Sequence, residues 1–294
     1  MDENKEPNYL HYFLTAYFYF LENDLNNSEN GLNDIKFQSE EANTDEHLKI
    51  YFQSYILENN EISKSGLKSI TINNGIDSKT IEIEHLESFK IKNVFLPEQL
   101  SVEQKKEITA SKSSVYTNPD LFLEISNGNN SFFESLELKS TKNNNIPGSS
   151  IQQVSPFEWV IFVKRNSDSV DISTGYYINS ITEKLPFPDR SPRPQIGFKT
   201  LTNWNKTYRK VKNNNLLIED TSELNEEKIK LLTDWQEYLA NEWLGIIKLN
   251  EVKNNEKWFN NALRKFAIKF LEYSEKLNET EKEKLKNKLN DLIK

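Results

Sequence analysis

The sequence predicts an α/β fold in which a mixed sheet of four to five strands is flanked by helices, with helical additions at both ends of the chain. Residues 8–26 and 45–60 carry apolar side chains at the spacing of amphipathic helices. Residues 115–182 are rich in the β-branched and aromatic residues that favour strands. From residue 223 to the end the helical spacing returns. The middle of the chain is therefore expected to hold the sheet.

The same patterns predict three regions. Residues 1–97 are expected to be mainly helical, with a weak hairpin within 69–96. Residues 98–213 are expected to form the core, opened by a helix over 98–112. Residues 214–294 should be helical.

Four strands are expected in the core. They are Leu121–Ser126, Phe132–Ser140, Glu158–Arg165 and Gly175–Ile181. The first two are joined by Asn127–Asn130, a sequence typical of a hairpin turn. Trp159–Val163 is apolar on both faces, as a buried central strand should be. A short helix is expected over Ser149–Val154, and residues 183–213 are expected to be irregular.

Composition excludes several kinds of chemistry. The chain has 294 residues, no Cys, three His and a formal net charge of -8. Disulfides, Cys-ligated zinc, iron–sulfur clusters and thiol nucleophiles are excluded, and an imidazole-built zinc site is not expected. The N-terminus is acidic where a secretory signal needs positive charge, and the aromatic run Tyr9–Leu21 is too short to span a bilayer. We therefore expect a cytoplasmic protein.

The expected hairpin carries two carboxylates and a lysine. Asn118–Asp120 leads into its first strand, and Glu137–Lys139 lies on its second. Strand alternation places Glu137 and Lys139 on one side and the leucine between them on the other, towards a core. This is the arrangement that a chemical site on a sheet needs. The alternative interpretation is a solvated polar face of a hairpin.

This pattern resembles the PD-(D/E)xK nucleases, in which one strand of a hairpin carries an Asp and the next carries an acid, any residue and a Lys. The segments that follow, Ile146–Gln153 and Glu158–Arg165, resemble the connecting helix and second buried strand of type II restriction endonucleases. The resemblance covers roughly residues 100–182 and implies a restriction-endonuclease-like core. No acid clearly matches a fourth ligand of that family. The three considered are Glu103, Glu107 and Glu124.

The resemblance implies Mg²⁺-dependent hydrolysis of double-stranded DNA that leaves 5′-phosphate and 3′-hydroxyl ends. Asp120 and Glu137, with the carbonyl of Leu138, would hold the ion, since Mg²⁺ prefers one or two carboxylates plus waters. Lys139 would orient or help deprotonate the attacking water. A homodimer is expected because cutting a duplex takes two strand cuts. A cognate DNA methyltransferase is expected in the same system.

A basic segment, residues 184–212, is the expected recognition segment for DNA. It contains eight Lys and Arg residues against one Asp, a local charge of +7. The candidates for DNA contacts are Lys142, Ser149, Gln152, Gln153, Arg190, Arg193, Lys199 and Arg209. Arg pairs well with guanine, and Gln with adenine. A solvated connector is the alternative for the segment, and a helix N-cap is the alternative for Ser149.

Two other functions remain open. One is a repair, recombination or mobile-element nuclease of the same fold, and the other is a non-enzymatic helical interaction protein in which the motif match is accidental. Trp235, Trp243 and Trp258 in the C-terminal helices have core-like spacing and are expected to pack rather than to stack on bases.

Overall fold

The chain forms two compact units, Met1–Pro186 with Ser191–Thr233, and Phe187–Arg190 with Asp234–Lys294. The computed structural model describes the larger part of both. The described residues are 8–27, 32, 46–73, 77–111, 119–149, 155–167, 169–182, 193–219, 223–248 and 257–293.

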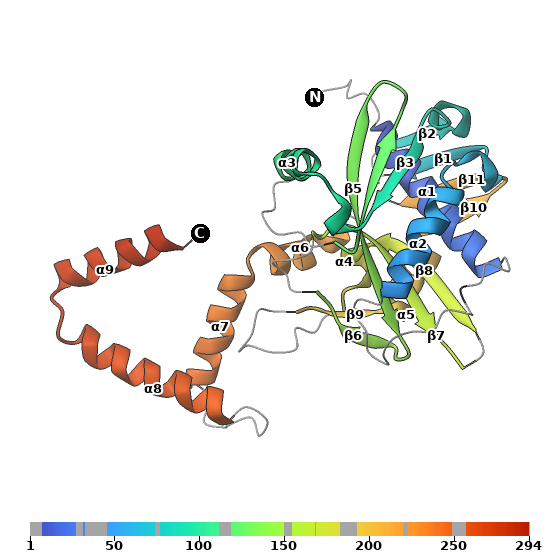
Figure 1. Cartoon of the computed structure of the whole chain (residues 1–294). Helices are drawn as coiled ribbons and strands as arrows, with labels where there is room; N and C mark the ends of the chain where they lie inside the picture. The colour runs from blue at the N-terminus through green and yellow to red at the C-terminus, as the bar shows by residue number, and fades with distance from the viewer. Residues whose placement is uncertain are drawn as a thin grey trace. The chain divides into compact units, whose positions relative to one another are not determined.

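A five-stranded mixed sheet forms the centre of the first unit (Figure 1). Its strands, in spatial order, are β3 (Lys90–Phe95), β4 (Leu121–Ser126), β5 (Ser131–Thr141), β7 (Trp159–Arg165) and β8 (Val170–Tyr176). β5 and β7 run parallel, and the other neighbouring pairs are antiparallel. The expected α/β class with a mixed sheet is thereby confirmed, and so is the hairpin of the first two predicted strands.

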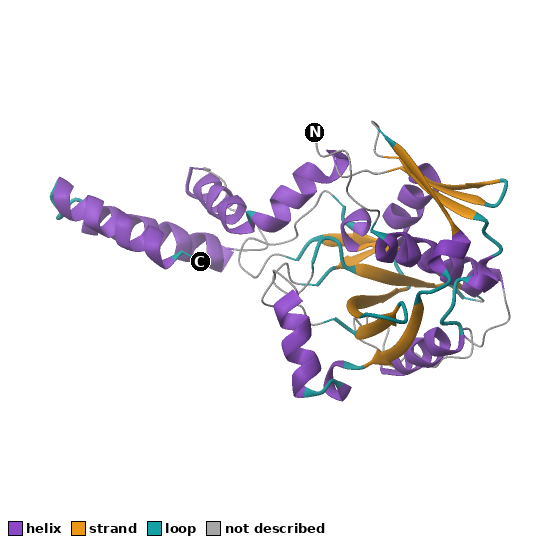
Figure 2. Ribbon diagram, turned by 90° about the horizontal axis from the view of Figure 1, so that it is seen from above, coloured by secondary structure: helices purple, strands orange, loops and turns teal. Residues whose placement is uncertain are grey.

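One face of this sheet is covered by α1 (Tyr9–Asn27), which packs against β8, and α2 (Glu46–Glu58), which packs against β3. Figure 2 shows strands lying between helices when the protein is seen from above. Alternation sends Leu136 and Leu138 to this face, where both are buried together with Phe18 of α1. Both N-terminal helices were expected from their apolar spacing, and both are confirmed.

The opposite face carries α3 (Val102–Ser111) and α5 (Phe198–Tyr208). Phe122 packs with residues at α3, and Phe198 of α5 meets Phe162 of β7 edge to face. The expectation of irregular structure over 183–213 is wrong from residue 195 onward, where β9 (Gln195–Gly197) and α5 form. α5 is stabilised by tertiary packing, since its apolar residues are buried while its lysines lie outside.

The last expected strand is also displaced. β8 ends at Tyr176, and the following residues form a short helix, α4 (Tyr177–Ser180), instead of continuing to Ile181. The backbone N–H of Tyr177 donates to the carbonyl of Glu158, which turns the chain out of the sheet. The helix expected over Ser149–Val154 lies, apart from Ser149, outside the described residues.

A second sheet has the order β10-β11-β1-β2. β1 (Ser69–Asn73) and β2 (Ser78–Glu82) pair antiparallel, which confirms the weak hairpin. β11 (Asn215–Glu219) pairs parallel with β1, and β10 (Arg209–Lys212) precedes it. The first 97 residues thus supply three strands as well as helices, and one of these strands, β3, belongs to the central sheet.

A short two-stranded sheet and a helix, α6, also belong to the first unit. β6 (Asn145–Pro147) pairs antiparallel with β9, and α6 (Glu226–Thr233) follows the second sheet. The pairing of β6 with β9 holds the segment after β5 close to α5. This segment reaches the polar cluster described below.

The second unit contains α7 (Trp235–Lys248), α8 (Lys257–Ser274) and α9 (Glu279–Leu292). Trp243 packs against Phe259, but Trp258 is 67% exposed, so the core packing expected for Trp258 is wrong. The 3.6-residue period identifies a helix face but not what covers it. No helix in the described ranges is both long and apolar enough to cross a membrane.

Candidate active site

The carboxylate of Asp120 lies directly against the Glu137–Lys139 tripeptide. Its Oδ2 accepts a hydrogen bond of 2.9 Å from the backbone N–H of Leu138, 18 residues along the chain. The register explains this contact. β4 pairs with β5 only as far as Leu121 opposite Leu136, and β5 then continues alone on that side. Because a buried N–H needs an acceptor, the side chain of Asp120 replaces the missing strand.

Glu137 and Lys139 point to the same face of β5 and form an ion pair, with Lys139 Nζ 2.5 Å from Glu137 Oε1. Both residues are buried, with exposures of 4% and 2%. The interpretation of a solvated polar face is therefore wrong for these residues. A buried charge is costly unless a partner compensates it. The burial indicates that this pair is held in place by the surrounding structure.

Ser149 fixes the other side of Glu137. Its hydroxyl donates to Glu137 Oε1 over 2.6 Å, and its backbone N–H donates to the hydroxyl of buried Tyr177 over 2.8 Å. Gly148 makes this approach feasible, because a Cβ there would lie 2.2 Å from the Tyr177 oxygen. Ser149 was expected to contact DNA or cap a helix. The structure instead uses its side chain to orient Glu137.

Lys49 is a member of the cluster that sequence reasoning missed. It lies on α2, and its Nζ is 2.8 Å from Asp120 Oδ1. The side chain of Lys49 is 20% exposed, whereas that of Asp120 is 3% exposed. No local pattern marks Lys49, since lysines on an amphipathic helix are ordinary. Only the packing of α2 near the central sheet brings it to Asp120.

The electrostatics of the cluster follow from its burial. Burial raises the pKa of Glu137, and the negative charge of Asp120 raises it further, while Lys139 and the hydroxyl of Ser149 oppose both effects. Burial also raises the pKa of Tyr177, with a further contribution from Glu137. Two carboxylates thus interact within one site and are balanced by two ammonium groups, those of Lys49 and Lys139.

The donor set suits a hard divalent cation. Asp120 and Glu137 offer carboxylates, and Leu138 between Glu137 and Lys139 offers a carbonyl; Mg²⁺ is commonly held by one or two carboxylates and completes its shell with water and phosphate oxygens. Among the described residues no group of three or more acidic, His or Cys side chains is placed to share a metal. The two-carboxylate set fits Mg²⁺ and does not resemble a transition-metal site.

The acids considered as a fourth ligand lie elsewhere. The carboxylate of Glu124 accepts from Asn93 over 2.6 Å and also contacts Ser131 at the turn end of the hairpin. Glu103 and Glu107 are exposed on α3. None of the contacts of these three acids joins them to Asp120 or Glu137.

The candidates for DNA contacts separate into groups. Lys142 at the end of β5, Arg193 before β9 and Lys199 in the first turn of α5 are exposed. Gln152, Gln153 and Arg190 lie outside the described residues.

Arg209 differs from the exposed candidates. Its Nη2 is 2.6 Å from Glu22 Oε1 on α1, and its side chain is only 11% exposed. Its guanidinium also lies over the ring of Tyr19. The expectation that Arg209 reads bases is corrected, because its charge is already paired inside the protein.

Lys164 is half-buried on β7, the strand beside β5. It aligns with Thr141 on the neighbouring strand, so alternation places it on the same face as Lys139. Lys164 Nζ donates to the backbone carbonyls of Lys142 and Asn143, the latter over 2.8 Å. Partial burial lowers the pKa of Lys164, and the positive charge of Lys199 lowers it further. Sequence reasoning missed Lys164 because its strand was identified only as a buried one.

A scan against protein-family models and searches of curated proteins and of solved structures found no match to this chain. The chemistry of the cluster must therefore be argued from its own residues.

The Lys49 contact leads to a stability prediction. In metal-free buffer, Lys49→Met should lower the free energy of unfolding by about 1–3 kcal/mol, because the buried Asp120 loses a charged partner. Added Mg²⁺ should raise the unfolding midpoint of this variant more than that of the wild type, since a cation at Asp120 no longer competes with an ammonium group. Thermal unfolding across a Mg²⁺ series measures both effects.

Lys90→Met is the matched control, because Lys90 pairs with Glu61 while half exposed and exposed pairs add little stability. An equal response of the two variants to Mg²⁺ would show that Lys49 has no influence on cation binding.

Proposed function

We propose that this protein is a type II restriction endonuclease of the PD-(D/E)xK superfamily, which hydrolyses double-stranded DNA at specific sequences with Mg²⁺ as cofactor. The observation that carries the proposal is the hydrogen bond from the Leu138 N–H to Asp120. This bond holds Asp120, which precedes β4, against Glu137 and Lys139 of β5 in one buried cluster. The resemblance to the nucleases requires these three side chains to lie together. A chance sequence match would not need such a contact.

Each side chain has a distinct task in this mechanism. Asp120 and Glu137, with the Leu138 carbonyl, would hold Mg²⁺, which when bound offsets phosphate charge and makes a water molecule more acidic. Ser149 and Lys139 keep the Glu137 carboxylate in one orientation. Lys139 Nζ would orient the attacking water or accept its proton. As the water oxygen bonds to phosphorus, the water gives up a proton, either to Lys139 in its neutral form or to solvent. The bond from phosphorus to the 3′ oxygen breaks, and the 3′ oxygen takes up a proton from solvent, leaving a 3′-hydroxyl and a 5′-phosphate.

Lys142 and Lys199 support a DNA path next to this cluster. Lys142 follows the end of β5, a few residues beyond Lys139, and Lys199 lies at the start of α5. The net charge of -8 does not oppose DNA binding, because a local basic surface supplies the phosphate contacts.

The proposal includes a homodimer, since one subunit has one such cluster and a duplex has two strands to cut. It also includes a DNA methyltransferase in the same system to protect the host sequence. A repair, recombination or mobile-element nuclease of the same fold is the second candidate. The same cluster supports it, and the difference is sequence specificity.

Digestion of unmethylated DNA with Mg²⁺ tests the proposal. We expect a discrete set of fragments and, from a supercoiled plasmid with one site, direct conversion to the linear form. A smear without discrete fragments would favour the second candidate, and accumulation of nicked circles would contradict concerted double-strand cutting. The folded protein could also cleave neither the unmethylated DNA nor the plasmid, even when the DNA offers a wide range of sequences. That result would favour the non-enzymatic interaction protein.

The exposed basic residues lead to a prediction for binding. Lys199→Ala should weaken binding to all duplexes alike and reduce the salt slope by about one, as the loss of one phosphate contact does. Arg193→Ala should cost about 1–3 kcal/mol on the cognate duplex and relax one position of the target if this Arg reads a guanine. Binding to cognate and singly altered duplexes in Ca²⁺ across a salt series distinguishes the two roles.

Arg209→Ala provides the contrast, because the loss of its ion pair with Glu22 should lower stability without changing the salt slope. If Lys199→Ala and Arg193→Ala both keep the wild-type DNA affinity, sequence discrimination and salt slope, residues 184–212 do not take part in DNA recognition.

A further inference from the structure

A cavity lies in the first unit, apart from the cluster around Glu137. It has a volume of about 320 Å³ and is bordered by α1, β8, α5 and the second sheet. Trp159 of its wall aligns with Leu136 and so points to the face of the central sheet opposite Glu137. The volume is at the lower end of the range for small-molecule sites. The cavity therefore suits a ligand of one or two rings.

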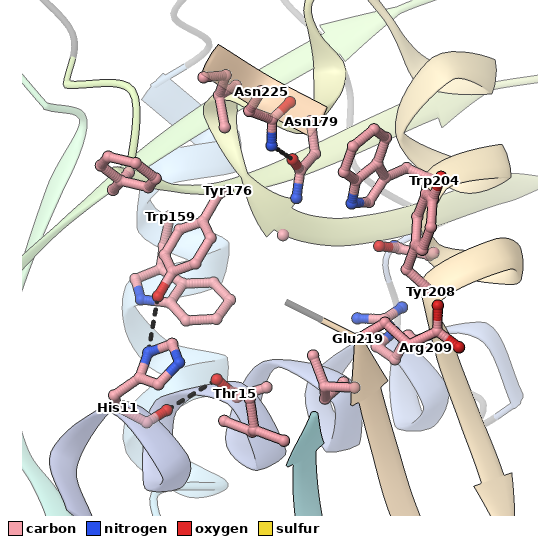
Figure 3. Close-up of a pocket in the computed structure, with 16 residues that line it drawn as sticks. His11, Thr15, Trp159, Tyr176, Asn179, Trp204, Tyr208, Arg209, Glu219 and Asn225 are labelled. Carbon is pink, nitrogen blue, oxygen red and sulfur yellow. Dashed lines mark hydrogen bonds between the residues drawn. The ribbon is translucent and has the colours of Figure 1, made fainter. Parts of the chain in front are cut away.

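Two aromatic walls define the shape of this cavity. Trp159 and Tyr176 form one wall, with ring centres 4.5 Å apart, and Trp204 and Tyr208 form the other, with ring centres 4.6 Å apart. Figure 3 shows the two pairs on opposite sides of the opening. Facing aromatic surfaces favour a flat ring between them, because stacking is available on both of its faces.

The wall with Tyr176 is held in a fixed orientation. The hydroxyl of Tyr176 and His11 Nδ1 share a hydrogen bond of 2.8 Å, and the two rings are nearly parallel. A wall that is already ordered loses little conformational freedom when a ligand stacks on it.

The third side of the cavity is polar. Asn225 Nδ2 donates to Asn179 Oδ1 over 3.0 Å, which leaves the amide nitrogen of Asn179 directed into the opening (Figure 3). Asn225 is 3% exposed, and its Oδ1 is buried without a hydrogen-bond partner. This oxygen points away from the opening, so the polar side offers a ligand one hydrogen-bond donor, the amide nitrogen of Asn179 (Figure 3).

The charges that line the cavity do not favour an anionic ligand. Arg209 is paired with Glu22 at 2.6 Å, and Glu219 adds a carboxylate to the lining. The part of a ligand inside the cavity should therefore be an uncharged ring, with any phosphate left outside.

We propose that this cavity binds a nucleobase, of which a purine such as adenine fits best. A flat, neutral ring system matches the two aromatic walls, and the N7 acceptor on its edge matches the amide N–H that Asn179 directs into the opening. The base could come from a free nucleoside or from an unpaired position in a DNA strand. The proposal does not depend on cleavage by the cluster around Glu137.

Titration of the full chain tests the proposal. Adenosine should quench tryptophan fluorescence in a saturable manner and release heat in calorimetry. Trp204→Ala should weaken its binding at least about tenfold, as expected for loss of a stacking partner. Asn179→Ala should weaken adenosine more than it weakens 7-deazaadenosine, which lacks the N7 acceptor.

Trp258→Ala is the matched control, because Trp258 is exposed in the second unit and should not affect binding. Trp204→Phe keeps a ring in the wall and should retain most of the affinity, which keeps the test decisive if Trp204→Ala unfolds. Glu137→Gln should bind adenosine like the wild type, so a failure of the nuclease proposal would not affect this result.

Two DNA duplexes distinguish the sources of the base. If the natural ligand is a base in DNA, a duplex with one unpaired adenine should bind tighter than the fully paired duplex, and Trp204→Ala should remove this difference. If only adenosine binds, the ligand is a free nucleoside. The proposal is overturned if neither adenosine nor the unpaired adenine binds to the wild type, if a folded Trp204→Ala variant binds them as tightly as the wild type does, or if Trp204→Phe loses as much affinity as a variant without the ring would.

Discussion

Replacing Lys139 by methionine should lower the rate of DNA cleavage by about 10²- to 10⁴-fold, the usual contribution of a positioned acid or base. Methionine keeps the volume of the side chain but cannot orient or deprotonate water. Glu137→Gln should have an effect of similar size, because it removes one of the two carboxylates that would hold the cation. Single-turnover cleavage of a cognate duplex at saturating Mg²⁺ measures both losses.

The burial of Glu137 and Lys139 means that neither side chain can be replaced without an effect on the fold. Glu137→Gln leaves a buried ammonium without its charged partner, and breaking such a pair costs about 3–5 kcal/mol. The variant that also carries Lys139→Gln should recover part of that stability, yet remain inactive. Urea unfolding of the single and double variants separates loss of chemistry from loss of fold.

Glu124→Gln is the matched control for the loss of a carboxylate in the same hairpin. Glu124 contacts Asn93 and Ser131, not the cluster around Glu137. The Glu124→Gln variant should therefore cleave DNA at nearly the wild-type rate. A folded Lys139→Met variant that still digests DNA as fast as this control would remove Lys139 from the mechanism.

Chelation of divalent cations should abolish cleavage completely, and Mg²⁺ should restore it. Mn²⁺ should support cleavage at some level, because it also binds oxygen ligands in a compact shell. Ca²⁺ should support DNA binding but not cleavage, since it takes more ligands at longer distances and does not impose the compact geometry. Cleavage and binding assays in parallel across the three cations check this pattern.

Asp120→Asn is the variant that connects this pattern to the cluster. The amide can still face Leu138 but carries no charge, so the Mg²⁺ concentration for half-maximal cleavage should rise strongly. In metal-free buffer DNA binding should be retained or tighter, because one negative charge near the phosphates is lost. Cleavage that persists in excess chelator would be incompatible with the proposed use of Asp120 and Glu137.

The sequence determined most of the secondary structure of the central sheet. The content of β-branched and aromatic residues and the turn at Asn127–Asn130 predicted the β4–β5 hairpin, and the two-sided apolar run in Trp159–Val163 predicted a buried strand. These features depend on neighbours within a few residues, so they can be read locally. Local patterns also identified Asp120, Glu137 and Lys139 as one candidate site.

Local patterns failed where charge or distant packing decided the outcome. The basic segment before residue 213 was predicted to be irregular, but the apolar residues of α5 pack on the central sheet and form a helix. Trp258 has the spacing of a core residue, yet it is exposed. A hydrophobic period shows that a face exists, whereas burial depends on which other element lies against it.

The sequence by itself determined which carboxylates could hold a cation. Only the tertiary structure decided which side chains balance their buried charges. Lys49 comes from a helix 71 positions before Asp120, Ser149 reaches Glu137 after the chain leaves β5, and Arg209 is paired with Glu22 of α1. A buried charge must find its partner in space, and the nearest partner in space is set by packing of whole elements, not by spacing along the chain.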